Sequence, residues 1–106
     1  MRHNKLVRDR IPEIIHANGQ VATTRVLSET EYLAALNAKL HEEVAEFCAS
    51  HNPEELADIL EVVYALAASL GVDEVELNAM RQHKRVERGG FEHRVFLIET
   101  QTGPNG

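Results

Sequence analysis

Four carboxylates occur in two pairs with the same spacing. Glu43 and Glu46 lie in the string HEEVAEF, and Glu55 and Asp58 lie in the string EELADIL. If both strings are helical, the two acids of each pair project from one side of their helix. Carboxylates beside an apolar helix face are costly unless a cation compensates them, and oxygen ligands suit a hard cation such as Mg²⁺ or Mn²⁺. The spacing therefore predicts a metal site of the kind that handles phosphates.

Two helices separated by a short break are expected to carry these pairs. Ser28 followed by Glu31 is a capping-box pattern, which predicts a long helix over about 29–50. Asn52-Pro53 ends this helix and opens a second one, because proline is favoured at the first helical position. Gly71 is a plausible end signal, so the second helix is expected to run to about residue 70.

The angular positions of the two pairs agree. At about 100° per residue, each pair lies on the same flank of the apolar stripe of its helix. The short break predicts antiparallel packing, and a rise of about 1.5 Å per residue places Glu46 and Asp58 at similar heights. The two pairs are therefore expected to converge. The alternative is that each acid is an exposed helix residue without a partner.

Shorter elements are expected on both sides of this helix pair. A short helix is predicted over residues 8–17 with Pro12 in its first turn, and a third long helix over about 73–88. Segments 21–27 and 91–99 contain β-branched or aromatic residues and are predicted to pair as strands. The expected fold is an all-α antiparallel bundle with a small β appendage. It forms one domain over residues 1–106, with a core over about 28–88 and a frayed tail over 101–106.

Charge and composition limit the classes of partner. Residues 28–76 contain twelve acids and one base, whereas the two flanks together contain ten bases and five acids. This distribution suits carboxylates that hold a metal ion and bases that hold phosphates, although acidic helices with solvated faces would look the same. A sequence pI of about 5.5 disfavours a nucleic acid polymer as partner. The lone Cys48 and the lack of a signal or membrane-spanning pattern predict a cytoplasmic protein.

The paired motifs also carry a family resemblance. HEEVAEF followed by EELADILEVVYAL resembles the MazG-like, all-α nucleoside triphosphate pyrophosphohydrolases, whose mark is E-E-x-x-E followed by E-x-x-D. KLVRDRIPEII and KRVERGGFEHRVFL are similar to a small subgroup, so the resemblance covers about residues 4–98. It implies a homodimer or homotetramer that uses Mg²⁺ to hydrolyse a nucleoside triphosphate to the monophosphate and pyrophosphate. Phosphoribosyl-ATP pyrophosphohydrolase activity and a non-catalytic helical oligomerisation module are the alternatives.

The resemblance implies roles for individual acids. Its metal ligands correspond to Glu43, Glu46, Glu55 and Asp58, and Glu42 is the additional acid of the motif. Glu42 or Glu46 is the expected acceptor of a proton from the attacking water. Only eight residues separate Glu46 from Glu55, fewer than in many relatives, so a loop that reads the nucleobase has little room.

Five polar residues are candidates for binding the substrate. Lys39 lies one turn before Glu43 and is expected either to contact phosphate or to form a helix-surface ion pair. The N-terminal string supplies Arg8, with pairing to Asp9 or to a helix acid as the alternative role. The third helix supplies the remaining candidates on one side: Asn78, Lys84 and Arg88.

Overall fold

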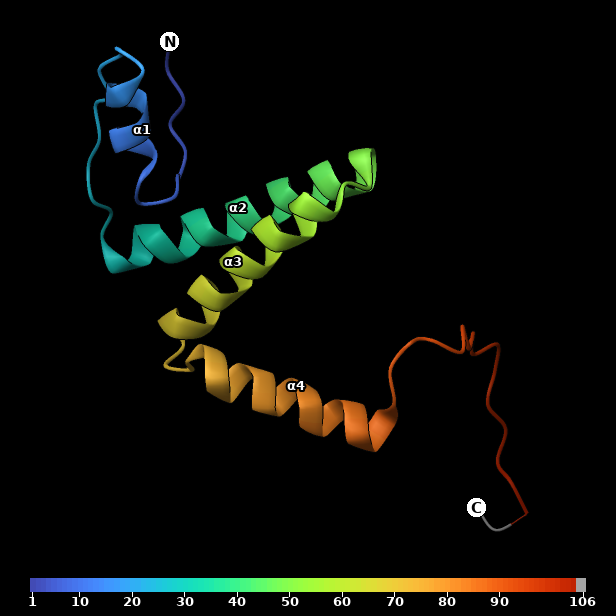
Figure 1. The fold of residues 1–106 in the computed structure, drawn as a ribbon. Helices are drawn as coiled ribbons and strands as arrows, with labels where there is room; N and C mark the ends of the chain where they lie inside the picture. Colours follow the sequence, from blue (N-terminus) through green and yellow to red (C-terminus); the bar gives the residue numbers. More distant parts are fainter. Residues whose placement is uncertain (105–106) are drawn as a thin grey trace. The chain divides into compact units, whose positions relative to one another are not determined.

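The computed structural model describes residues 1–104, and all regular structure in that part of the chain is helical. The helices are α1 (Ile11–Ala17), α2 (Glu29–Ser50), α3 (Pro53–Ser69) and α4 (Glu74–Arg88) (Figure 1). The predicted all-α class is confirmed. Among these helices, none combines the length and apolar character that a membrane span requires. The chain divides into two compact units, Met1–Glu74 and Val75–Gly106, and the prediction of one domain stays a prediction.

The start of α2 is fixed by the predicted capping box. The Ser28 hydroxyl accepts a hydrogen bond from the Glu31 backbone N–H at 3.2 Å, and the Glu31 carboxylate accepts one from the Ser28 N–H at 3.1 Å. Arg25 donates to the same carboxylate at 2.9 Å. These hydrogen bonds, with Arg25 first, lower the pKa of Glu31 to about 2. The helix therefore begins where the sequence predicts, with its first N–H groups satisfied.

A tight connection joins α2 to α3. His51 adopts a left-handed conformation with φ of 54° and donates its N–H to the Phe47 carbonyl at 2.7 Å. The Asn52 side chain then caps α3 by accepting from the Glu54 N–H at 3.0 Å, and Pro53 occupies the first turn. α2 and α3 pack side by side and antiparallel (Figure 1), and theirs is the only helix–helix packing among the described residues. Leu36, Val62 and Ala67 are the apolar side chains buried there.

The predicted β appendage is wrong. Neither segment 21–27 nor segment 91–99 forms a strand in the described chain, and their β-branched side chains are exposed, with Val26 at 97% and Val95 at 88%. A strand requires a hydrogen-bonding partner, and local propensity cannot supply one. The two segments also belong to different compact units.

The N-terminal helix is shorter than predicted. Arg8 and Asp9 belong to a turn that the Ile11 N–H closes by donating to the Arg8 carbonyl at 3.0 Å, and α1 begins only at Ile11. Pro12 lies in its first turn as expected. At the other end of the chain, part of the tail predicted to fray, residues 105–106, lies outside the described residues.

Candidate metal site

Three of the four predicted ligands meet between α2 and α3. Glu43 comes from α2, and Glu55 and Asp58 come from α3. Each offers one carboxylate oxygen, and these three oxygens all lie within 4.8 Å of one another. The antiparallel packing and the short connection produce this convergence, because they hold the two motifs at the same height. A role as metal ligands stays a prediction for these residues.

Glu43 is the buried member of the cluster. Its residue is 7% exposed, and its Oε1 lies 3.3 Å from the Lys39 ammonium nitrogen. Its second oxygen, Oε2, is buried and has no hydrogen-bond partner. Burying a carboxylate oxygen without a hydrogen-bond partner costs desolvation free energy that nothing offsets, so each such group calls for an explanation. Three converging carboxylates with one unsatisfied oxygen fit a Mg²⁺ or Mn²⁺ ion, which prefers oxygen ligands.

The carboxylates of the site perturb one another. The pKa of Glu55 is raised from its ordinary value of 4.5, first by partial burial and then by the negative charges of Glu46, Asp58 and Glu43. A hydrogen bond with the Glu46 side chain contributes in the same direction. Glu46, the fourth predicted ligand, therefore lies beside Glu55 and next to the three-residue cluster rather than within it. A proton or a divalent cation would relieve this repulsion.

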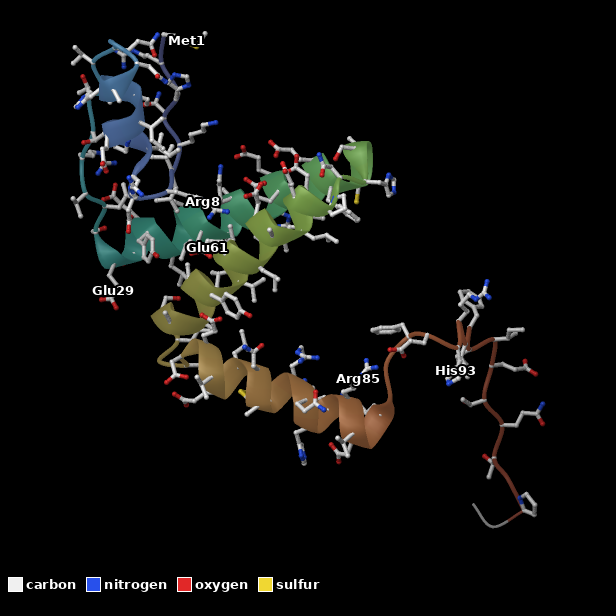
Figure 2. All side chains as sticks on the ribbon, viewed as in Figure 1. Met1, Arg8, Glu29, Glu61, Arg85 and His93 are labelled. Carbon is white, nitrogen blue, oxygen red and sulfur yellow. The ribbon has the colours of Figure 1, made fainter. Side chains whose placement is uncertain are left out.

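Two basic side chains contact the cluster. Arg8 Nη2 lies 2.6 Å from Asp58 Oδ1, across a sequence separation of 50 residues, and Figure 2 shows Arg8 beside α2 and α3. Lys39 lies between Glu43 and Glu42, 3.3 Å from the first and 3.5 Å from the second. Partial burial lowers the pKa of Lys39, but the hydrogen bond to Glu43 and the two negative charges outweigh this effect and raise it. Arg8 and Lys39 thus take the ion-pair roles that the sequence left open as alternatives.

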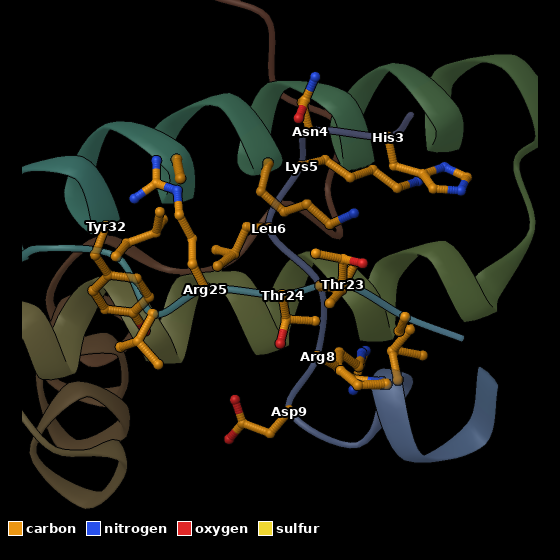
Figure 3. A pocket seen from close by; sticks show the side chains of 18 of the residues that line it. His3, Asn4, Lys5, Leu6, Arg8, Asp9, Thr23, Thr24, Arg25 and Tyr32 are labelled. Carbon is orange, nitrogen blue, oxygen red and sulfur yellow. The ribbon is translucent and has the colours of Figure 1, made fainter. Parts of the chain in front are cut away.

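A broad groove adjoins the cluster in the first unit. Its walls are the N-terminal segment 1–9, the segment 20–27 and one side of α2 (Figure 3). Lys5, Leu6 and Arg8 line it from the first segment, and Tyr32 lines it from α2. Arg8 and Lys39 each line the groove and also contact an acid of the cluster, so these two bases connect the groove to the cluster. Glu42 of α2 lines the groove as well.

The sequence does not predict this groove, because its composition indicates a strand over residues 21–27. The available signal was the basic N-terminal string, whose Lys5 and Arg8 both line it. The remaining substrate candidates lie on α4, in the second compact unit, and are Asn78, Lys84 and Arg88. Their part in substrate binding stays a prediction.

Comparison with known proteins leaves the family open. No protein-family model matches the chain, and no solved structure matches it. A protein of Mycolicibacterium smegmatis (strain ATCC 700084 / mc(2)155), described only as an uncharacterized protein, is 61% identical over 46 residues. These residues are 43% of this chain and 47% of that protein, so the matched part spans about half of its relative.

Proposed function

We propose that this chain is a Mg²⁺-dependent nucleotide pyrophosphohydrolase of the MazG-like kind, which hydrolyses a nucleoside triphosphate to the monophosphate and pyrophosphate. The observation that carries the proposal is the convergence of Glu43, Glu55 and Asp58 from two helices, with their oxygens within 4.8 Å and Glu43 Oε2 buried without a partner. The motif spacing that resembles this family lies on the same residues. Mn²⁺ is the expected substitute for Mg²⁺.

In this proposal the acidic cluster binds the ion and the groove binds the phosphate chain of the substrate. Glu43, Glu55 and Asp58 would hold the ion, with Glu46 completing the set beside Glu55. When bound, the ion supplies positive charge against the phosphate oxygens of the substrate. Basic side chains in the groove bind and orient the phosphate chain, because ammonium and guanidinium groups form strong, charge-assisted hydrogen bonds to phosphate.

The attacking water needs a proton acceptor that faces the substrate. Glu42 lines the groove and is half-buried next to Lys39, so it is within reach of a molecule lying there. We assign it the role of general base. Glu46 is the less suitable of the two predicted bases, because it lies beside Glu55 and is not among the residues that line the groove.

Association with further copies of the chain is part of the proposal. Only three apolar side chains are buried among the described residues, whereas Leu56, Leu60 and Leu70 on and just after α3 are 45%, 51% and 75% exposed. A monomer gains little stability from so small a core, which favours a homodimer or homotetramer. The same exposed residues favour a second candidate function, a non-catalytic helical oligomerisation module.

Pyrophosphate release from a panel of nucleotides tests the proposal. The panel contains the standard and several modified nucleoside triphosphates together with phosphoribosyl-ATP, each with Mg²⁺ and with EDTA. We expect Mg²⁺-dependent release from a free triphosphate, and a loss of at least roughly 100-fold in the Glu43→Ala/Asp58→Ala double variant, since even residues that only support metal ligands cost 10–100-fold.

A matched control separates the cluster from general acidity. Glu61 is an exposed acid of α3 and lies outside the cluster, so Glu61→Gln should retain the wild-type rate. Turnover of phosphoribosyl-ATP alone would assign the chain to that activity instead. Equal and negligible release from the wild type and the double variant across the whole panel would refute the enzyme and support the oligomerisation module.

A further inference from the structure

The ion pair between Arg8 and Asp58 joins the groove to the acidic cluster. The guanidinium contacts Asp58 Oδ1 at 2.6 Å, and Asp58 is one of the three carboxylates whose oxygens lie within 4.8 Å of one another. Both side chains remain partly exposed, at 55% for Arg8 and 40% for Asp58. An exposed ion pair of this kind contributes little stability, so it is readily exchanged for another partner.

A cation that binds the cluster and Arg8 require the same carboxylate. A divalent ion coordinated by Asp58 carries twice the charge of the guanidinium, and it neutralises the negative charge that attracts Arg8. The two cations are therefore competitors for Asp58. Glu43 does not present the same conflict, because Lys39 contacts its Oε1 while its Oε2 is free of any partner in the described structure.

Arg8 also lines the groove, where Lys5 and Lys39 are neighbouring bases (Figure 3 labels Lys5 and Arg8). A guanidinium displaced from Asp58 thus remains at the wall of a groove that already carries positive charge. Its planar set of donors suits two oxygens of one phosphate group. The groove therefore offers Arg8 a second partner at the time when it loses the first.

We infer that Arg8 exchanges partners during substrate binding: it pairs with Asp58 until a divalent ion takes that carboxylate, and it then binds a phosphate group of the nucleotide in the groove. This inference rests on the proposed function, because it requires both a metal ion and a phosphate. The exchange makes ion binding and nucleotide binding mutually supportive. The ion occupies Asp58, which otherwise competes with phosphate for Arg8, and the nucleotide binds Arg8, which otherwise competes with the ion for Asp58.

Two titrations of the full-length chain test the exchange. Mn²⁺ alone is titrated calorimetrically into the wild type, Arg8→Gln and Arg10→Gln, and α,β-methylene-ATP is then titrated into each protein saturated with Mn²⁺. Arg10→Gln is the matched control, because it removes the same charge two residues away from a side chain whose acidic contact is Glu13, at 3.4 Å. Unfolding temperatures in EDTA verify that all variants are folded.

The exchange predicts effects of opposite sign in one variant. Arg8→Gln should bind Mn²⁺ about 2- to 5-fold more tightly than the wild type, because the competitor is gone. It should bind the nucleotide analogue about 10-fold more weakly, the loss expected for a hydrogen bond to a charged group. Arg8→Lys should recover most of the analogue affinity, and Arg10→Gln should resemble the wild type in both titrations.

Other results overturn the inference. Equal Mn²⁺ affinities for Arg8→Gln and Arg10→Gln would reduce the effect to net charge, and weaker Mn²⁺ binding by Arg8→Gln would make Arg8 a support for Asp58 rather than its competitor. Unchanged affinity for the analogue would remove the phosphate role. In each case the wild type still binds Mn²⁺, so the proposed function stands, whereas a wild type that binds no Mn²⁺ refutes both.

Discussion

Replacing Glu43 by glutamine should stabilise the protein in EDTA and remove most of its stabilisation by Mg²⁺. The Glu43 charge is attracted to Lys39 across 3.3 Å and repelled by two carboxylates whose oxygens lie within 4.8 Å. With an effective dielectric constant of about 20–80, the two repulsions exceed the attraction by about 0.5–2 kcal/mol. Glutamine keeps the volume and lets the Lys39 ammonium donate to its carbonyl oxygen, so the substitution removes the charge without opening a cavity.

Mg²⁺ should make the wild type more stable than Glu43→Gln, which is the reverse of the order expected in EDTA. An ion present at 100 times its Kd stabilises the wild type by about 2.7 kcal/mol, and a 100-fold weaker variant gains only about 0.4 kcal/mol. At about 4–8 °C per kcal/mol, the wild-type Tm rises by more than about 10 °C, whereas that of Glu43→Gln rises by about 2–3 °C.

Thermal unfolding followed by circular dichroism at pH 7.5 measures both effects, at one protein concentration because association also changes Tm. Glu61→Gln serves as control and should show the full wild-type rise with Mg²⁺. The reasoning is refuted if Glu43→Gln unfolds at a lower temperature than the wild type in EDTA, since repulsion then does not dominate. A Mg²⁺-induced rise equal to that of the wild type would refute the ligand role of Glu43.

Three further predictions address the site, the fold and the assembly. The raised pKa of Glu55 means that the folded chain holds the proton of this carboxyl group more tightly than the unfolded chain does. The stability measured in EDTA should therefore fall as the pH rises above about 4.5 and through the raised pKa. The Tm gain from Mg²⁺ should grow over the same pH interval. Ser28→Ala removes half of the capping box and should lower the stability by about 1 kcal/mol in urea unfolding. Leu60→Glu places a charge on a half-exposed apolar position of α3 and should shift sedimentation at micromolar concentration toward the monomer.

The sequence predicted the elements whose signals are local. The capping pattern at Ser28 and the Asn52-Pro53 break defined α2 and the start of α3, because caps and proline act within one turn of the residues that encode them. The convergence of Glu43, Glu55 and Asp58 followed from helical geometry once the break was known to be short. The same geometry did not separate Glu46 from the cluster, since that depends on side-chain conformation rather than on spacing.

Features that depend on distant segments were not predictable in this way. Val21–Leu27 has the composition of a strand, yet whether a strand forms depends on a partner elsewhere in the chain, and none is present in the described part. The pairing of Arg8 with Asp58 spans 50 residues, so the sequence offered it only as one of several options. The groove depends on both of these features and therefore became apparent only in the structure.

The brevity of the α2–α3 connection has a consequence for insertions and deletions. One residue added within α3 between Pro53 and Glu55 would turn both of its acids by about 100° around the helix axis, so that they no longer face Glu43, and would also shift them by about 1.5 Å along it. A residue added between Asn18 and Leu27 would only lengthen a segment without regular structure. Length changes in natural variants of this chain should therefore collect before residue 28 and avoid residues 43–58.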